Sequence, residues 1–162
     1  MKTDITLTVN GEAVRETVEP RTSLADLLRD RLRLTGTHVG CEMGSCGACL
    51  VMLDGVPVHS CLVLAVQVSG QTVSTIEGLN DSGDIADLQR NFHDRNALQC
   101  GFCTNGMIMS AQALLSDNPS PSRPEIRDAL SGNYCRCTGY EAIVDAISET
   151  AMQRGAIVEP AQ

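Results

Sequence analysis

The sequence reads GCEMGSCGAC at residues 40–49, so three cysteines follow one another with a C-x4-C-x2-C spacing. A fourth comes after eleven further residues, and the first group is therefore Cys41, Cys46, Cys49 and Cys61. The remaining cysteines form a C-x2-C pair and a C-x-C pair: Cys100, Cys103, Cys135 and Cys137. All eight cysteines of the chain thus belong to two groups of four.

Each group has the ligand count of a [2Fe–2S] cluster, and the spacing of the first three cysteines is that of plant-type ferredoxins. Small residues fill most other positions of residues 40–49. Main-chain N–H groups can therefore approach the sulfur atoms of an anionic cluster and stabilise it. We predict two [2Fe–2S] clusters on this chain and a role in moving single electrons.

Three other uses of cysteine fit less well. Disulfides suit small secreted chains, but the first residues, MKTDITLTVNGE, are polar and contain no apolar export segment. Structural zinc prefers repeated C-x2-C pairs. A Rieske centre needs two histidine ligands, and no C-x-H pattern includes His38, His59 or His93.

The composition disfavours nucleic-acid and membrane partners. The 162 residues suit one domain or two small ones. Twelve Lys and Arg against twenty Asp and Glu give a net charge of −8, the wrong sign for binding phosphates. The longest apolar run, residues 62–66, is too short to span a bilayer. We expect a cytoplasmic protein.

The first half of the chain has the pattern of a small mixed sheet crossed by one helix. The dipeptides Asn10-Gly11 and Asp54-Gly55 each predict a tight hairpin turn. Thr22 or Ser23 can cap a helix over residues 24–32. A helix on a small sheet, with a metal loop between helix and strand, is the pattern of a β-grasp ferredoxin, predicted over residues 1–79.

The second half is predicted to be helical over residues 84–152, after a polar linker at residues 80–83 and before a tail at residues 153–162. Four short helices are expected: one capped by Asp84, one from about Thr104, and two opened by capping boxes at residues 122–125 and 138–141. Thr104 and Thr138 each follow a cysteine. As N-caps they would direct two helix N-termini towards the second cluster.

The segments QCGFCTNGMIM (residues 99–109) and GNYCRCTGYEAI (residues 132–143) resemble the signatures of one family, the small iron–sulfur subunit of the molybdenum hydroxylases, or xanthine oxidase family. The resemblance covers roughly residues 3–150. It implies an α+β fold, with a β-grasp plant-type ferredoxin domain followed by a four-helix [2Fe–2S] domain. The partners implied are a large molybdopterin-binding (Mo) subunit and a medium FAD-binding subunit, in a heterotrimer or a dimer of heterotrimers.

The resemblance also implies roles for single residues. The group at Cys100, Cys103, Cys135 and Cys137 matches the cluster proximal to molybdenum, and the group at Cys41, Cys46, Cys49 and Cys61 matches the distal one. Gln99 and Cys137 match the residues that contact the pterin. From the residues alone, a solvated loop residue is the simpler interpretation of Gln99. Electrons would pass from molybdenum through both clusters to FAD. A stand-alone two-cluster electron carrier is the alternative.

The remaining residues near the cysteines are expected to be structural. Asn105 stands where the family commonly has proline, which affects only the start of one helix. We expect Arg136 to lie on the surface or in an ion pair. Aromatic packing that excludes water is expected of Phe102, Tyr134 and Tyr140.

Overall fold

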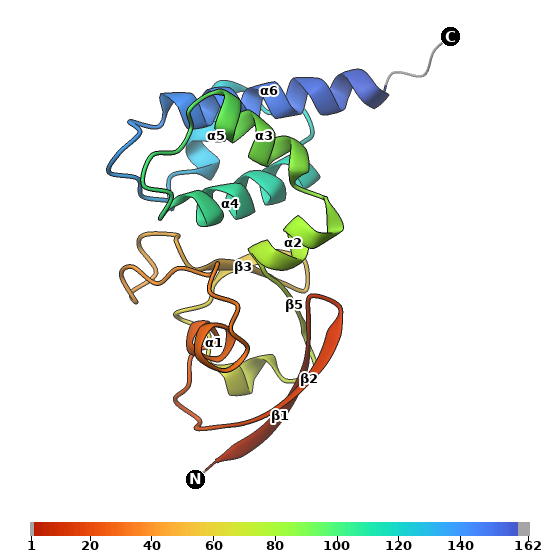
Figure 1. The fold of residues 1–162 in the computed structure, drawn as a ribbon, viewed down its shortest axis with the longest axis vertical. Helices are drawn as coiled ribbons and strands as arrows, with labels where there is room; N and C mark the ends of the chain where they lie inside the picture. Colours follow the sequence, from red (N-terminus) through yellow and green to blue (C-terminus); the bar gives the residue numbers. More distant parts are fainter. Residues whose placement is uncertain (1, 159–162) are drawn as a thin grey trace.

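The computed structural model describes residues 2–158, which form a sheet half and a helical half stacked along the long axis (Figure 1). The sheet half contains five strands and the first helix. In chain order the strands are β1 (Thr3–Val9), β2 (Glu12–Val18), β3 (Leu50–Leu53), β4 (Val56–His59) and β5 (Thr72–Ser74).

The sheet is mixed, with the strand order β2-β1-β5-β3-β4. β5 lies parallel to β1 and antiparallel to β3, and the two hairpins are antiparallel. Both predicted turns are confirmed. Asn10 and Gly11 have φ values of 50° and 85°, and Asp54 and Gly55 have 48° and 83°, the left-handed backbone that a two-residue hairpin turn needs.

The helix of the sheet half begins as α1 (Leu24–Asp26) and continues as a π-helical turn, η1 (Leu27–Arg31). Ser23 is its cap, as predicted, because its hydroxyl accepts a hydrogen bond from the amide of Asp26 at 3.0 Å. The other helices are the 3₁₀ turn η2 (Ala65–Val68), α2 (Ile76–Ser82), α3 (Ala86–Asp94), α4 (Thr104–Asp117), α5 (Arg123–Ala129) and α6 (Glu141–Val158).

Strand β3 contributes to two hydrophobic cores at once. Val51 is fully buried in the core of the sheet half, with the leucines of α1 and η1. Leu50 and Met52 point to the opposite face and join the core of the helical half, where α4 packs on β3. Since alternate strand residues face opposite sides, three consecutive residues connect the two halves.

Two predictions about the connection between the halves are wrong. Residues 80–83 are not a linker, because α2 runs to Ser82 and ends on Gly83, whose φ is 83°. Asp84 does not cap the next helix. Its carboxylate accepts a hydrogen bond from the hydroxyl of Ser82, and α3 begins after Ile85 without a side-chain cap.

The predictions for the last two helices have different outcomes. The capping box of α5 is confirmed, with Ser122 and Glu125 each bonding the other's amide. The predicted tail at residues 153–162 is wrong in part, because α6 continues to Val158. Residues 159–162 lie outside the described part of the chain. No helix within residues 2–158 is long and apolar enough to cross a membrane.

Candidate metal centre

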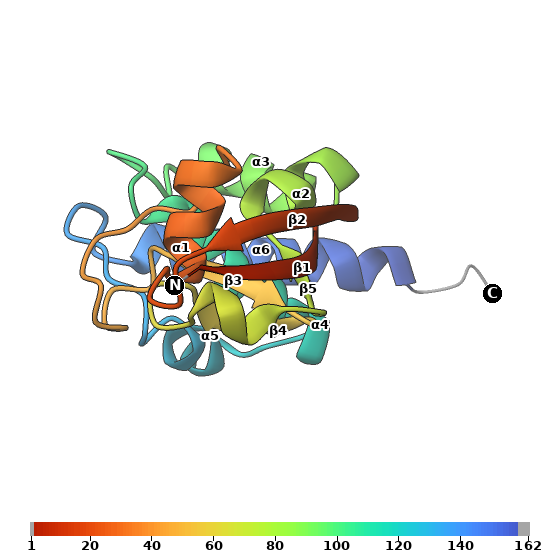
Figure 2. The same cartoon turned by 90° about the horizontal axis from the view of Figure 1, so that it is seen from below.

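Both groups of cysteines lie at the same edge of the molecule. The loops that carry them extend to the left in Figure 1 and again in Figure 2, a view turned by 90°. The first group lies in the loop before β3 and just after β4. The second group lies in the α3–α4 and α5–α6 loops.

The thiols within each group of four lie near one another. The sulfur atoms of Cys100 and Cys137 are 3.7 Å apart. Cys46 acts on the pKa of the Cys41 thiol, Cys49 on that of Cys61, and Cys135 on that of Cys103. Cys61 and Cys103 are each influenced by two other cysteines of their own group, so the four thiols of each group form one cluster.

Whether four thiols fit a single ion or a two-iron cluster depends on how closely they converge. One tetrahedral zinc would hold four sulfur atoms at mutual distances of about 3.8 Å. Within the described residues, no three His, Cys, Asp or Glu side chains converge on a single ion. Two thiolates on each of two irons is the arrangement of a [2Fe–2S] cluster, so the thiols present fit that group.

Main-chain amides surround the sulfur of Cys41. The N–H groups of Met43, Ser45 and Cys46 point to it at 3.5, 3.4 and 3.4 Å. Led by the amides of Met43 and Cys46, these bonds lower the pKa of the Cys41 thiol to about 7. An environment that stabilises a thiolate is also one that stabilises a coordinated, negatively charged sulfur.

Two glycines make this loop conformation possible. Gly44 and Gly47 have φ values of 74° and 72°, which side chains rarely adopt. A Cβ atom on Gly44 would lie 2.5 Å from the Cδ1 atom of Leu62, beside Cys61. The glycines of the motif therefore let the backbone close around the sulfur atoms, as the sequence predicts.

In the second group of cysteines, burial and hydrogen bonds shift the pKa values of the thiols in opposite directions. Burial raises the pKa of the Cys103 thiol to about 12. Burial also raises the pKa of the Cys135 thiol, but donors from Thr138 and the amide of Cys137 outweigh it and bring that pKa below its ordinary value. The hydroxyl of Thr138 lies 3.1 Å and its amide 3.5 Å from the sulfur of Cys135.

The predicted N-cap roles of the two threonines are therefore wrong. Thr104 is the first residue inside α4, whose N-cap is Cys103, and its hydroxyl is buried without a partner in the described structure. Thr138 lies ahead of α6, and its hydroxyl serves the sulfur of Cys135, so the capping box predicted at residues 138–141 does not form.

The hydroxyl of Thr138 bonds a cysteine sulfur and that of Thr104 does not, so the two threonines provide a matched pair of variants. Thr138→Val should lower the reduction potential of the second cluster by on the order of 50 mV, because the lost donor stabilises the more negative, reduced state. Thr104→Val should leave that potential unchanged, since within the described residues its hydroxyl bonds no cysteine sulfur. Redox titration followed by electron paramagnetic resonance measures both. Equal shifts in the two variants would contradict the assignment.

Gln99 is exposed and adjacent to the second group. Its side-chain amide donates to the carbonyl of Cys137 at 3.0 Å, so it is held by the loop and is not simply solvated. Its carbonyl oxygen remains available as an acceptor. Arg136, between two cysteines, is exposed, in agreement with a surface position.

The aromatic residues differ from the prediction. Phe102 and Tyr134 are 49% and 60% exposed, so they do not exclude water in the isolated chain. Tyr140 holds the second loop in shape: its hydroxyl donates to the carbonyl of Asn133 at 3.0 Å and accepts from the amide of Cys135 at 2.8 Å. Nothing in the local sequence indicates this role, because the three residues meet only in the folded loop.

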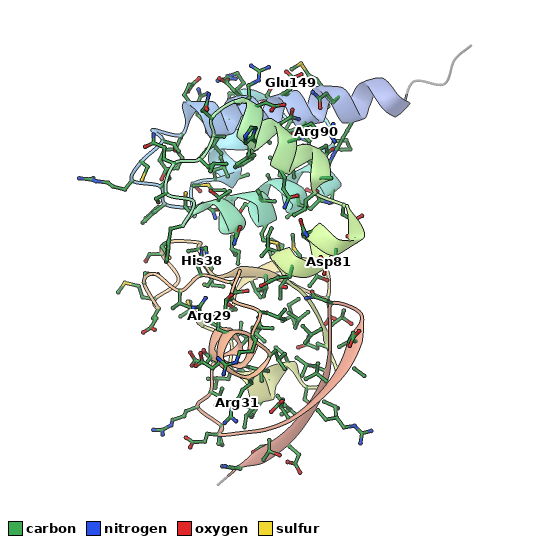
Figure 3. All side chains as sticks on the ribbon, viewed as in Figure 1. Arg29, Arg31, His38, Asp81, Arg90 and Glu149 are labelled. Atoms are coloured by element: carbon green, nitrogen blue, oxygen red, sulfur yellow. The ribbon has the colours of Figure 1, made fainter. Side chains whose placement is uncertain are left out.

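Contacts between the halves surround the cysteine loops. His38 lies where the halves meet (Figure 3). Its ring stacks on that of Phe102, with the ring centroids 4.8 Å apart. Its Nδ1 atom also forms a hydrogen bond with the main-chain carbonyl oxygen of Phe102, at 2.8 Å. Asn105, in the first turn of α4, donates to the carbonyl of Gly36 at 2.8 Å. The residue that replaces the family's proline thus connects α4 to the sheet half.

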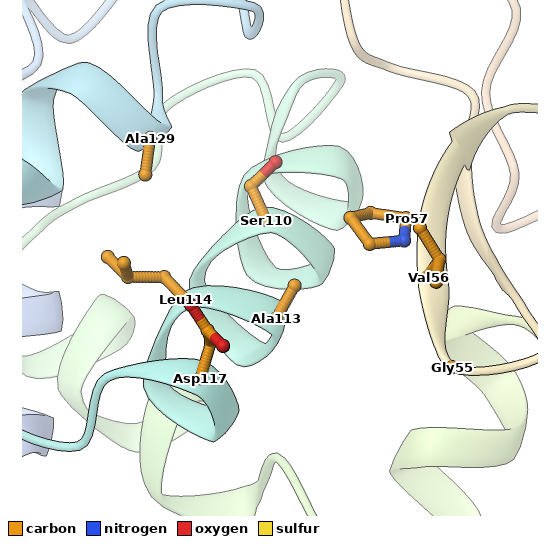
Figure 4. Close-up of a pocket in the computed structure, with 8 residues that line it drawn as sticks. All are labelled: Gly55, Val56, Pro57, Ser110, Ala113, Leu114, Asp117 and Ala129. Atoms are coloured by element: carbon orange, nitrogen blue, oxygen red, sulfur yellow. The ribbon is translucent and has the colours of Figure 1, made fainter.

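A pocket of about 410 Å³ lies between the β3–β4 turn and helices α4 and α5 (Figure 4). Its lining is mostly small and apolar, with Ser110 and Asp117 as the polar side chains. It contains no cysteine or histidine, so it is separate from the candidate metal centre. The residues that line it are Gly55, Val56, Pro57, Ser110, Ala113, Leu114, Asp117 and Ala129.

Comparison with known proteins matches each half of the chain to a family of iron–sulfur domains. A family described as a 2Fe-2S iron-sulfur cluster binding domain matches residues 7–76, and one described as a [2Fe-2S] binding domain matches residues 75–148. The caffeine dehydrogenase subunit gamma of Pseudomonas sp. (strain CBB1) is 51% identical over 150 residues, which cover 91% of this chain and 90% of that protein. The nicotine 6-hydroxylase small subunit of Paenarthrobacter nicotinovorans is 49% identical, covering 95% and 93%.

The chain belongs to the small iron–sulfur subunits of the molybdenum hydroxylases. A chain in the crystal structure of quinoline 2-oxidoreductase from Pseudomonas putida 86 matches this small subunit with a TM-score of 0.90 and 48% identity over 99% of each chain. Aldehyde oxidoreductase from Desulfovibrio gigas matches with a TM-score of 0.88 and 40% identity over 97% of the small subunit but only 18% of its own chain. The same fold therefore occurs as a separate subunit and within a longer chain.

Proposed function

We propose that this small subunit relays electrons one at a time from a molybdopterin site on a large partner subunit to FAD on a medium partner subunit. When bound, a [2Fe–2S] cluster accepts and donates a single electron. The observation that carries the proposal is the gathering of eight thiols, in two groups of four, at one edge of a chain of this family. We also propose that the sheet half is a β-grasp ferredoxin domain and that the helical half is a four-helix [2Fe–2S] domain.

The two groups of cysteines have different tasks in this proposal. The second group would hold the cluster nearer the pterin, and the first group would hold the cluster nearer FAD. The exposure of Gln99, Cys100 and Cys137 supports the first assignment, since a pterin edge could reach the free acceptor of Gln99 and the sulfur of Cys137. The exposure of Met43 and Leu62, at 70% and 57%, supports a partner surface beside the first group.

The proposal is tested by isolating the chain from its native host with its partners attached and measuring iron, molybdenum and flavin. We expect about four irons for each molybdenum, with FAD and two larger companion chains. Four irons without molybdenum and without companion chains would contradict the subunit role and favour a stand-alone two-cluster carrier. Zinc in place of iron would contradict both.

A further inference from the structure

Two glycines lie where the halves approach each other closely. Gly47 lies in the first cysteine loop, and Gly106 lies in the first turns of α4. A Cβ atom on Gly106 would be 2.1 Å from the carbonyl oxygen of Gly47. One on Gly47 would be 2.5 Å from both the side-chain nitrogen of Asn133 and the carbonyl oxygen of Gly132. The first loop is thus enclosed between α4 and the loop before Cys135.

Asn133 is the polar side chain at the centre of this contact. It is 3% exposed, and its side-chain oxygen accepts a hydrogen bond at 2.7 Å from Ser110 of α4, itself 8% exposed. Its side-chain nitrogen donates to the carbonyl of Gly47 at 3.4 Å. One amide thereby joins a helix of the second half to the cysteine loop of the first.

The backbone of Asn133 holds the second cysteine loop. Its amide donates to the carbonyl of Leu130 at 2.9 Å, and its carbonyl accepts from the hydroxyl of Tyr140 at 3.0 Å. The next amide, that of Tyr134, donates to the carbonyl of Cys46 at 2.9 Å. Asn133 therefore contacts both cysteine loops, two residues before Cys135 and next to the residue that bonds Cys46.

We propose that Asn133 is a positioning residue that fixes the first cysteine loop against the second and so sets the separation and orientation of the two bound clusters. The inference rests on the proposed function, because it requires both [2Fe–2S] clusters. A buried amide whose oxygen and nitrogen are both bonded specifies one geometry, since any slip of the loops leaves polar atoms unpaired in a medium of low dielectric.

A buried asparagine could instead contribute to stability alone, and Asn91 is the matched control for that explanation. Asn91 is 5% exposed and donates to Thr150 at 2.9 Å and to Gln153 at 3.1 Å, so it joins α3 to α6 within the helical half. Asn91→Ala removes the same kind of buried amide and touches neither cysteine loop.

The test uses the complete, fully reduced complex carrying Asn133→Ala, Ser110→Ala or Asn91→Ala. Electron paramagnetic resonance measures the mutual splitting of the two cluster signals, which depends on their separation and orientation. We expect Asn133→Ala to lose part of this splitting, Ser110→Ala to lose less, and Asn91→Ala to keep all of it at equal iron content. Ser110→Ala keeps the bond from Asn133 to Gly47 and provides the milder variant.

The outcomes separate this inference from the proposed function. An unmodified complex without two [2Fe–2S] signals would overturn both. Two signals whose splitting is the same in Asn133→Ala as in the unmodified complex would overturn the positioning role and leave the electron-relay function standing. An equal loss of splitting in Asn91→Ala would reduce Asn133 to a contributor to stability and would overturn the inference.

Discussion

A chain with Cys49 replaced by alanine is expected to hold about two irons instead of about four and to lose the first cluster only. Cys49 is 2% exposed, at the position that leads into β3, and it raises the pKa of the neighbouring Cys61 thiol. Because metal binding contributes directly to the folding free energy of such loops, the variant should also unfold more easily. Iron analysis and electron paramagnetic resonance of the purified protein measure the effect.

Ser45→Ala is the control for Cys49→Ala. Ser45 supports Cys41 through its main-chain amide, at 3.4 Å, so loss of its side chain should leave the iron content at about four. Cys135→Ala should give the reverse pattern, with the first cluster kept and the second lost. An iron content unaffected by Cys49→Ala would show that this thiol is not a ligand.

Alanine in place of Gly106 is expected to lower the free energy of unfolding by about 1–3 kcal/mol. Within a helix, alanine is ordinarily better than glycine by about 1 kcal/mol. Here the new Cβ would lie 2.1 Å from the main-chain oxygen of Gly47, which is backbone and cannot rotate away. The overlap therefore outweighs the gain in helix propensity.

Gly155 provides the opposite case. It lies in α6, and a Cβ there would meet nothing within 4 Å, so Gly155→Ala should raise stability by up to about 1 kcal/mol. In a chain of this size each kcal/mol of stability shifts the Tm by about 2–4 °C. Thermal unfolding should therefore show that Gly106→Ala lowers the Tm and that Gly155→Ala raises it. Stabilisation by both substitutions would contradict the close contact between the halves.

Sequence reasoning succeeds where a few neighbouring residues decide the structure. The turns at Asn10-Gly11 and Asp54-Gly55 need left-handed backbone that asparagine, aspartate and glycine tolerate, so the dipeptides are sufficient. The capping box of α5 is equally local, because Ser122 and Glu125 need only each other.

The same reasoning fails at residues 138–141, where the helix-capping pattern competes with another local contact, to the sulfur of a cysteine three residues earlier. Thr138 could cap a helix with Glu141, but its hydroxyl donates to the sulfur of Cys135 and accepts from the amide of Tyr140. Tyr140 then adopts a left-handed backbone, with φ of 69°, and its own hydroxyl holds the loop. Thr138 and Tyr140 therefore stabilise the cysteine loop and do not form the start of the helix.

Relations between distant residues lie beyond the local pattern. Asn133 and Gly47 are 86 positions apart, and only the folded chain brings them together. The glycine at position 106 gives a partial signal, because glycine inside a helix is unfavourable and suggests a close contact. The partner in that contact, the carbonyl of Gly47, could not be deduced from it.

The position of β5 has a consequence for how the protein is made. This strand is the last of the five to be synthesised, yet it occupies the middle of the sheet between β1 and β3. Until Thr72–Ser74 has left the ribosome, the sheet half consists of two separate hairpins with open inner edges. All four cysteines of the first group precede that point. Iron delivered earlier would meet thiols on a loop that is not yet anchored, so we expect cluster insertion to follow closure of the sheet.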